Sequence, residues 1–99
     1  MNISQTPAVT VYTREQIRGA IQDALSAIAP EVDWASVDPN RPLRAQVDLD
    51  SFDFLNAIIR LHDTLGVDIP EQDYGKLATL SSTIDYLAHR LSEGAAAPR

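Results

Sequence analysis

Side chains that could do chemistry are concentrated around one serine. Ser51 is flanked by Asp48, Asp50 and Asp53, and the stretch of residues 48–70 continues as a helical pattern that closes on a glycine and a proline. A hydroxyl among carboxylates could serve as a nucleophile, belong to a cation site or carry a phosphate. The spacing of the surrounding residues distinguishes these three kinds of chemistry.

A calcium-binding loop does not fit this run of acids. Such a loop needs an oxygen ligand where Phe52 stands, a glycine where Asp53 stands and a glutamate where Ile59 stands. His62 and His89 fall on different predicted helices, and no further metal donors cluster beside them. Positions at the surface or rim explain these histidines better than a zinc site, so we expect no metal.

Catalysis by the chain itself is also not indicated. The chain has no cysteine, which excludes disulfides, thiolate zinc sites and a cysteine nucleophile. It contains neither a glycine-rich phosphate loop nor the G-x-S-x-G turn of hydrolases. No spacing suggests that Ser51, a histidine and a carboxylate converge into a triad. We therefore expect a protein that is not an enzyme and has no catalytic residues.

Composition narrows the class of partner. A length of 99 residues suits one domain, and 44% hydrophobic with 22% charged residues is typical of a folded chain. The net charge of −6 disfavours nucleic acids and anionic membranes and favours a basic patch on a protein. The N-terminal segment lacks the basic and apolar regions of a signal peptide, and no apolar run approaches the roughly 20 residues of a membrane span. We expect a cytoplasmic monomer.

The elements before Ser51 are a helix and a long loop. Thr13 followed by Gln16 forms a capping box, apolar residues then recur at three- and four-residue spacing, and Pro30 ends the helix. Residues 30–49 form a loop in which Trp34 and Val37 could make one short helical turn. Three apolar side chains should pin this loop onto the helices: Leu43, Val47 and Leu49.

The second helix should begin near Ser51 and end near Leu65, with Gly66 in the left-handed position. A spacing of roughly 100° per residue separates two faces on it. The inner face contains Phe54, Ile58, Leu61 and Leu65. The outer face contains Phe52, Asn56, Ile59 and Asp63, flanked by Leu55 and His62.

Two further helices complete an all-α fold. A brief third helix is expected from about Gln72 to Leu77, and a last helix is capped by Thr79 and stopped by Gly94. Its apolar stripe is Leu80, Ile84, Leu87, Ala88 and Leu91. The sequence thus predicts three main helices, one short helix and no sheet. Residues 13–92 should form the domain, between flexible tails at 1–12 and 93–99.

Ser51 has a plain interpretation and a functional one. A serine or aspartate at a helix start usually caps it, and nearby aspartates suit the positive end of any helix. A hydroxyl at that position is also well placed to carry a phosphate, because free N–H groups and the helix dipole favour an anion. Acids and outward apolar side chains beside it would form a small docking surface.

Several short segments together resemble the acyl carrier protein family. They are DSFD at 50–53, DIP at 68–70, LATL at 77–80 and IDYL at 84–87, and the resemblance covers about residues 13–92. It implies a four-helix bundle with a long first loop. It also implies that a separate phosphopantetheinyl transferase joins 4′-phosphopantetheine from coenzyme A to Ser51, beside Asp50. The thiol of that arm would carry acyl groups between acyl-loading and acyl-processing enzymes.

The resemblance also assigns two sets of residues. By position, the partner-binding surface would comprise Phe52, Asp53, Leu55, Asn56, Ile59, Arg60 and Asp63. The acyl pocket would comprise Phe54, Ile58, Leu61 and Ile84. A bulky ring at Phe54 should limit that pocket, so we expect shorter or more exposed cargo.

Departures from the family pattern indicate a specialised, free-standing carrier. Phe52 stands where leucine or methionine is usual, Asn56 replaces an acid, and Arg60 and His62 make the second helix less negative than in carriers of primary fatty acid synthesis. The pathway could be fatty-acid-like, lipid or secondary-metabolite synthesis. Two alternatives remain: a peptidyl or aminoacyl carrier, and an unmodified helical interaction module in which Ser51 is only a cap.

Overall fold

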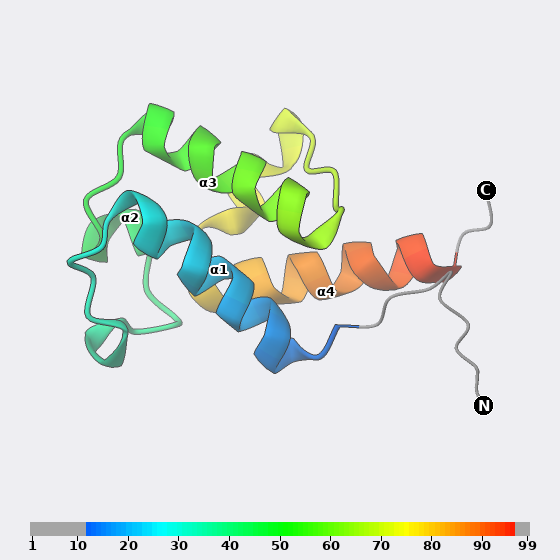
Figure 1. The fold of residues 1–99 in the computed structure, drawn as a ribbon, viewed down its shortest axis with the longest axis horizontal. Helices are drawn as coiled ribbons and strands as arrows, with labels where there is room; N and C mark the ends of the chain where they lie inside the picture. Colours follow the sequence, from blue (N-terminus) through cyan, green and yellow to red (C-terminus); the bar gives the residue numbers. More distant parts are fainter. Residues whose placement is uncertain (1–11, 97–99) are drawn as a thin grey trace.

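Three long helices form the body of the computed structural model, which describes residues 12–96, with side chains to residue 92. They are α1 (Arg14–Ile28), α3 (Ser51–Leu65) and α4 (Leu80–Ala96), and α1 packs against both of the others (Figure 1). Short helical pieces occupy the connections: η1 (Trp34–Ser36), α2 (Leu43–Gln46) and η2 (Glu71–Leu77). Residues 12–96 contain no strand, so the expected all-α bundle is confirmed.

Helix α1 begins and ends where the sequence predicts. The Thr13 hydroxyl accepts the Gln16 N–H at 3.1 Å, and the Gln16 side chain accepts the Thr13 N–H at 2.9 Å, which completes a capping box. Ile17, Ile21 and Leu25 are buried at successive turns, and the helix ends before Pro30. Local pattern and tertiary packing agree along the whole helix.

Helix α3 follows the expected bounds, and three of the four residues predicted on its inner face are buried: Ile58, Leu61 and Leu65. Asp50 is the N-cap, and Gly66 takes the left-handed conformation at φ 71°, which costs glycine little. Ala57 is buried beside them, whereas Phe54 is only half-buried. Phe54, also predicted on the inner face, is less buried than the other three, because its ring lies between the core and a surface groove.

The long loop packs onto the helices as expected, and it contains a helical turn, α2, that the sequence did not indicate. Leu43, Val47 and Leu49 are buried, and Leu43 begins the four-residue helix α2. The Leu43 N–H donates to the Ala78 carbonyl at 2.8 Å, which ties the loop to the junction before α4. The Gln46 side chain accepts the Asp38 N–H at 2.7 Å, so the loop is also closed on itself.

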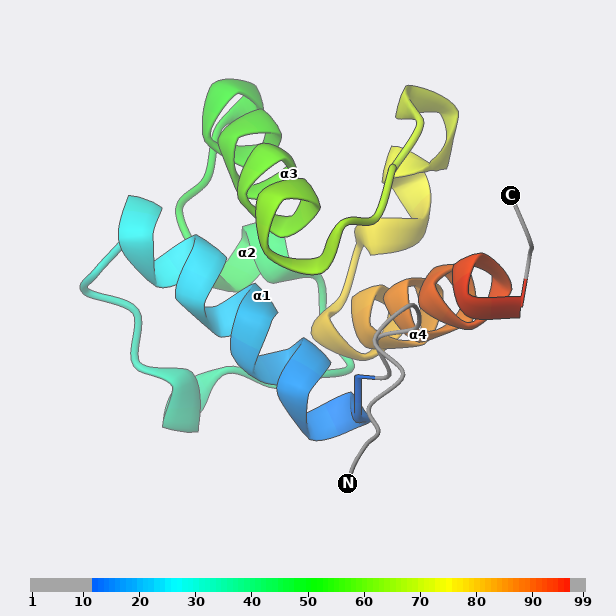
Figure 2. The ribbon, with the colours of Figure 1, turned by 45° about the vertical axis from the view of Figure 1, so that its right-hand side comes forward.

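The last two elements differ from expectation in type and length. The predicted third helix is present as the 3₁₀ helix η2, which leads into α4 and packs on it (Figure 2). The Thr79 hydroxyl caps α4 by accepting the Ser82 N–H at 2.9 Å. The helix continues through Gly94 to Ala96, so the prediction that Gly94 stops it was wrong. A single glycine costs a helix only about 1 kcal/mol.

Tyr12, one residue before the predicted domain, also packs against the core. Tyr12 is half-buried against the core, and its hydroxyl donates to the Thr64 carbonyl at 3.4 Å. The rest of the predicted N-terminal tail, residues 1–11, lies outside the described residues, as do 97–99. Within the described part, no helix is long and apolar enough to cross a membrane.

Candidate functional site

Ser51 is the first residue of α3 and is exposed to solvent. Its hydroxyl makes no hydrogen bond within residues 12–92. The Asp50 carboxylate accepts the Asp53 N–H, and the Asp50 carbonyl accepts the Phe54 N–H. The Ser51 and Phe52 N–H groups therefore remain available at the positive end of a helix of 15 residues. A phosphoester on this hydroxyl would lie beside these unpaired N–H donors.

Asp50 orients the turn that presents Ser51. Its carboxylate is engaged with the backbone of its own helix at 2.8 Å. In this structure Asp50 therefore acts as an N-cap, and its predicted contribution to cofactor binding stays a prediction.

A surface groove opens beside Ser51, between α2, the start of α3 and η2. Its volume is about 470 Å³. We call it the Ser51 groove; it is lined by Arg44, Ser51, Phe54, Leu55, Glu71, Tyr74, Gly75, Leu77 and Ala78. Polar groups of Arg44, Glu71 and Tyr74 share it with apolar side chains. The Ser51 groove is open to an arm attached at Ser51.

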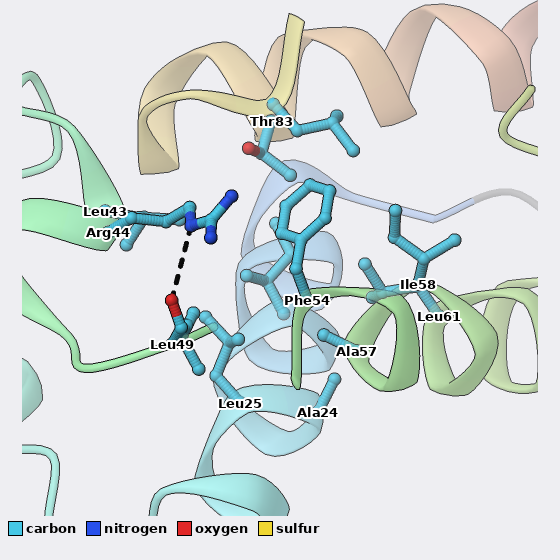
Figure 3. A pocket seen from close by; sticks show the side chains of 12 residues that line it. Ala24, Leu25, Leu43, Arg44, Leu49, Phe54, Ala57, Ile58, Leu61 and Thr83 are labelled. Atoms are coloured by element: carbon cyan, nitrogen blue, oxygen red, sulfur yellow. Dashed lines mark hydrogen bonds between the residues drawn. The ribbon is translucent and has the colours of Figure 1, made fainter. Parts of the chain in front are cut away.

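A second, smaller space lies behind the groove, within the helical core (Figure 3). This inner cavity measures about 30 Å³, room for roughly one or two water molecules. The Phe54 ring lines both the groove and the cavity and stands between them. The Phe54 and Tyr74 rings meet edge to face, with 5.6 Å between their centroids. The Arg44 guanidinium carbon lies 5.7 Å from the centroid of the Phe54 ring. These two contacts hold the ring in place.

The predicted pocket residues are only partly brought together. Phe54, Ile58 and Leu61 line the inner cavity, whereas Ile84 is buried in the core elsewhere. Thr83, one position earlier on α4, lines the cavity instead. Sequence reasoning also missed Arg44, because no periodicity indicates where a residue of the loop will lie relative to α3. Whether these residues shelter an acyl chain stays a prediction.

The outer face of α3 exposes three large apolar side chains. Phe52 is 71% exposed, Ile59 57% and Leu55 43%. Arg60 and Asp63 are exposed with them, and the structure places Asp53 and Asn56 beside them as half-buried side chains. The residues predicted to bind partners thus all lie on α3, the helix whose first residue is Ser51.

The remaining predicted chemistry lies elsewhere. His62 is at the far end of α3, about 16 Å along the axis from Ser51, with its Nδ1 3.1 Å from the Val67 carbonyl oxygen. His62 therefore does not form a triad with Ser51. The described residues contain no group of three His, Asp or Glu side chains that could hold a metal ion.

Electrostatics perturb one carboxylate near the groove. The Tyr86 hydroxyl donates to Asp73 Oδ2 at 2.6 Å, and Lys76 Nζ lies 3.4 Å from Oδ1. The hydrogen bond from Tyr86, aided by the Lys76 charge, lowers the pKa of Asp73 from its ordinary value, against a smaller opposing effect of desolvation. These contacts fasten η2, one wall of the groove, to α4.

Comparisons with known proteins agree with this geometry. The family model described as "Phosphopantetheine attachment site" matches residues 15–87. The acyl carrier protein of Rubrobacter xylanophilus is 31% identical over 74 residues, covering 75% of this chain and 90% of the relative. That of Lactobacillus johnsonii is 31% identical over 75 residues, covering 76% and 92%.

Solved structures show the same fold. The acyl carrier protein of Enterococcus faecalis superposes with a TM-score of 0.62 at 21% identity, covering 80% of this chain and 99% of that one. The 3,5-dioxohexyl carrier protein of the actinorhodin polyketide synthase from Streptomyces coelicolor gives 0.56 at 24% identity, covering 88% and 99%.

Proposed function

Because this chain belongs to the acyl carrier protein family, whose members carry covalently attached 4′-phosphopantetheine, we propose that the arm is joined to the hydroxyl of Ser51. One observation carries this assignment: an exposed, unbonded hydroxyl on the first residue of α3, opening onto a groove. The unpaired Ser51 and Phe52 N–H groups would face the phosphodiester. The bound cofactor supplies the thiol that this cysteine-free chain lacks.

The chain's own contribution is to present and orient the arm. Asp50 fixes the turn, so Ser51 points to solvent, where a phosphopantetheinyl transferase can reach it. The Ser51 oxygen would attack the phosphorus of coenzyme A that bears the pantetheine, and adenosine 3′,5′-bisphosphate would leave as the diphosphate bond breaks. The serine oxygen would then be part of the new phosphodiester, and its proton would pass to a base of the transferase. Acyl-loading and acyl-processing enzymes would then act on the thioester, which makes this chain a carrier and not a catalyst.

The outer face of α3 is our proposed docking surface for these enzymes. Phe52, Leu55 and Ile59 supply exposed apolar area, and Asp53 and Asp63 supply negative charge. Arg60 and Asn56 reduce that charge, which supports service in a dedicated pathway of lipid or secondary-metabolite type with less basic partners. The domain proposed for this role spans about residues 13–92.

The two alternatives are less well supported. Family membership argues against an unmodified interaction module. A peptidyl or aminoacyl carrier would bear the same arm, but the relatives described above are acyl carriers, and the segment VDLD before Ser51 lacks the glycines usual in peptidyl carriers.

Intact mass spectrometry tests the attachment residue. The protein is incubated with coenzyme A and a promiscuous phosphopantetheinyl transferase, beside Ser51→Ala and Ser92→Ala. Ser92 is an exposed helical serine on α4 and serves as the matched control. We expect the mass of one phosphopantetheine on the wild type and on Ser92→Ala, and none on Ser51→Ala. Loading of Ser51→Ala would overturn the assignment.

A further inference from the structure

Arg44 carries a positive charge into the Ser51 groove without a carboxylate partner. Its Nε donates to the Leu49 carbonyl at 3.3 Å, and its guanidinium lies over the Phe54 ring (Figure 3). No carboxylate in the described part of the chain is within ion-pairing distance of it, although Glu71 lines the same groove. The terminal nitrogens of the guanidinium are therefore available to a ligand.

The position of Arg44 is fixed by the fold. It belongs to α2, next to Leu43, which is buried and whose N–H donates to the Ala78 carbonyl. The Leu49 carbonyl and the Phe54 face then orient the side chain itself. A guanidinium held in this way loses little freedom when it binds, which favours recognition of a planar group.

The available space argues against a long apolar cargo at this location. The inner cavity of about 30 Å³ cannot take an alkyl chain of several carbons unless the Phe54 ring moves. The groove outside, about 470 Å³, has ample room. The terminal guanidinium nitrogens of Arg44 also lie at this groove. When an arm at Ser51 folds back into this groove, its cargo meets the Arg44 cation beside the Phe54 ring.

We propose that Arg44 is a specificity-determining residue, which binds a carboxylate at the distal end of a short acyl group carried in the Ser51 groove. A carboxylate matches the planar fork of arginine, and an alkyl end does not. This inference rests on the proposed attachment at Ser51. Glu71, which lines the same groove, opposes the binding through its own negative charge and limits its strength.

The phosphodiester of the arm is another anion that Arg44 could meet. The helix N-terminus already offers the Ser51 and Phe52 N–H groups to that phosphate. Arg44, in contrast, is directed at the Phe54 ring, one turn farther along α3. We therefore assign Arg44 to the cargo and use the test to separate the two anions.

The test compares two cargoes of matched shape. A promiscuous transferase loads the protein from glutaryl-coenzyme A or 5-methylhexanoyl-coenzyme A, in which methyl groups replace the carboxylate oxygens. Intact mass confirms each loading, so failure of the attachment itself is detected separately. The ¹⁵N NMR signals of Arg44 Nε–H and the Gly75 amide are then compared among the apo, the holo and the two acyl forms.

We expect glutaryl to shift both signals and 5-methylhexanoyl to leave them near their holo positions. Arg44→Gln should abolish the Gly75 shift and speed cleavage of the glutaryl thioester by hydroxylamine up to about fivefold, the upper end for an exposed ion pair. Arg41→Gln makes the same charge change on a neighbouring side chain that does not line the groove, and should behave as wild type. Glu71→Gln should enlarge the shift.

Two outcomes would overturn the proposal. If both cargoes gave equal shifts, the carboxylate would not be recognised. If the Arg44 signal moved on conversion from apo to holo and then ignored the cargo, its ligand would be the phosphodiester.

Discussion

Asp50 and Asp53 each accept the backbone N–H of the other. Asp50 Oδ1 accepts the Asp53 N–H at 2.8 Å, and Asp53 Oδ2 accepts the Asp50 N–H at 3.4 Å. This reciprocal pair encloses Ser51 and Phe52 and fixes the first turn of α3 without using the serine hydroxyl. A serine in this place is therefore free to be modified while an aspartate caps the helix.

The Asp50 cap should account for a measurable part of the stability. Asp50→Ala removes an N-cap and should lower the free energy of unfolding by about 1 kcal/mol. Urea denaturation of the apo protein measures this, with Asp48→Ala as control because the Asp48 carboxylate makes no hydrogen bond within the described residues. Equal losses in both variants would show that general charge, and not the cap, is responsible.

Phe54 should control entry to the inner cavity. Loading an octanoyl group on wild-type protein should leave the methyl NMR signals of Ile58 and Leu61 in place, because the ring fills the entrance. Phe54→Leu should open the entrance, and the same loading should then shift them. Phe52→Leu repeats the substitution on an exposed ring and should behave as wild type. Octanoyl-dependent shifts in the wild type would contradict this account.

Charge on the outer face of α3 should select partner enzymes. Asn56→Glu with Arg60→Glu makes the face more negative and should raise turnover by fatty-acid-synthase enzymes about threefold to tenfold. Asn40→Glu with Arg41→Glu gives the same change of net charge on the exposed loop and serves as control. The hypothesis of a dedicated pathway fails if the unmutated protein already works equally well with those enzymes and with its own partners.

Attachment of η2 to α4 should depend on pH through Asp73. The pKa of Asp73 is lowered in the folded state, so the contribution to stability is present above the ordinary carboxylate pKa and is lost as the pH falls through the lowered value. Tyr86→Phe removes the hydrogen bond that is the main cause, and should return the Asp73 pKa toward its ordinary value. A ¹³C NMR titration of the carboxylate measures this. Tyr74→Phe removes a neighbouring hydroxyl and should leave the titration unchanged.

Local signals in the sequence predicted the helices well. The Thr13–Gln16 capping box and the left-handed Gly66 depend only on a few adjacent residues, and both are in place. The site could be predicted only in part, because its walls come from distant segments. The periodicity of the sequence does not indicate that Arg44 lies over Phe54. It also does not distinguish Thr83, which lines the cavity, from its neighbour Ile84, which does not. Such details depend on how α2 and α4 dock against α3.

The central claim is that Ser51 carries the arm, and peptide-level mass spectrometry of the modified wild-type protein tests it most directly. The holo protein is digested and the phosphopantetheine-bearing peptide is fragmented to locate the modified residue. We expect the group on Ser51 alone. Modification at another serine, or none under conditions that fully load a control carrier, would contradict it.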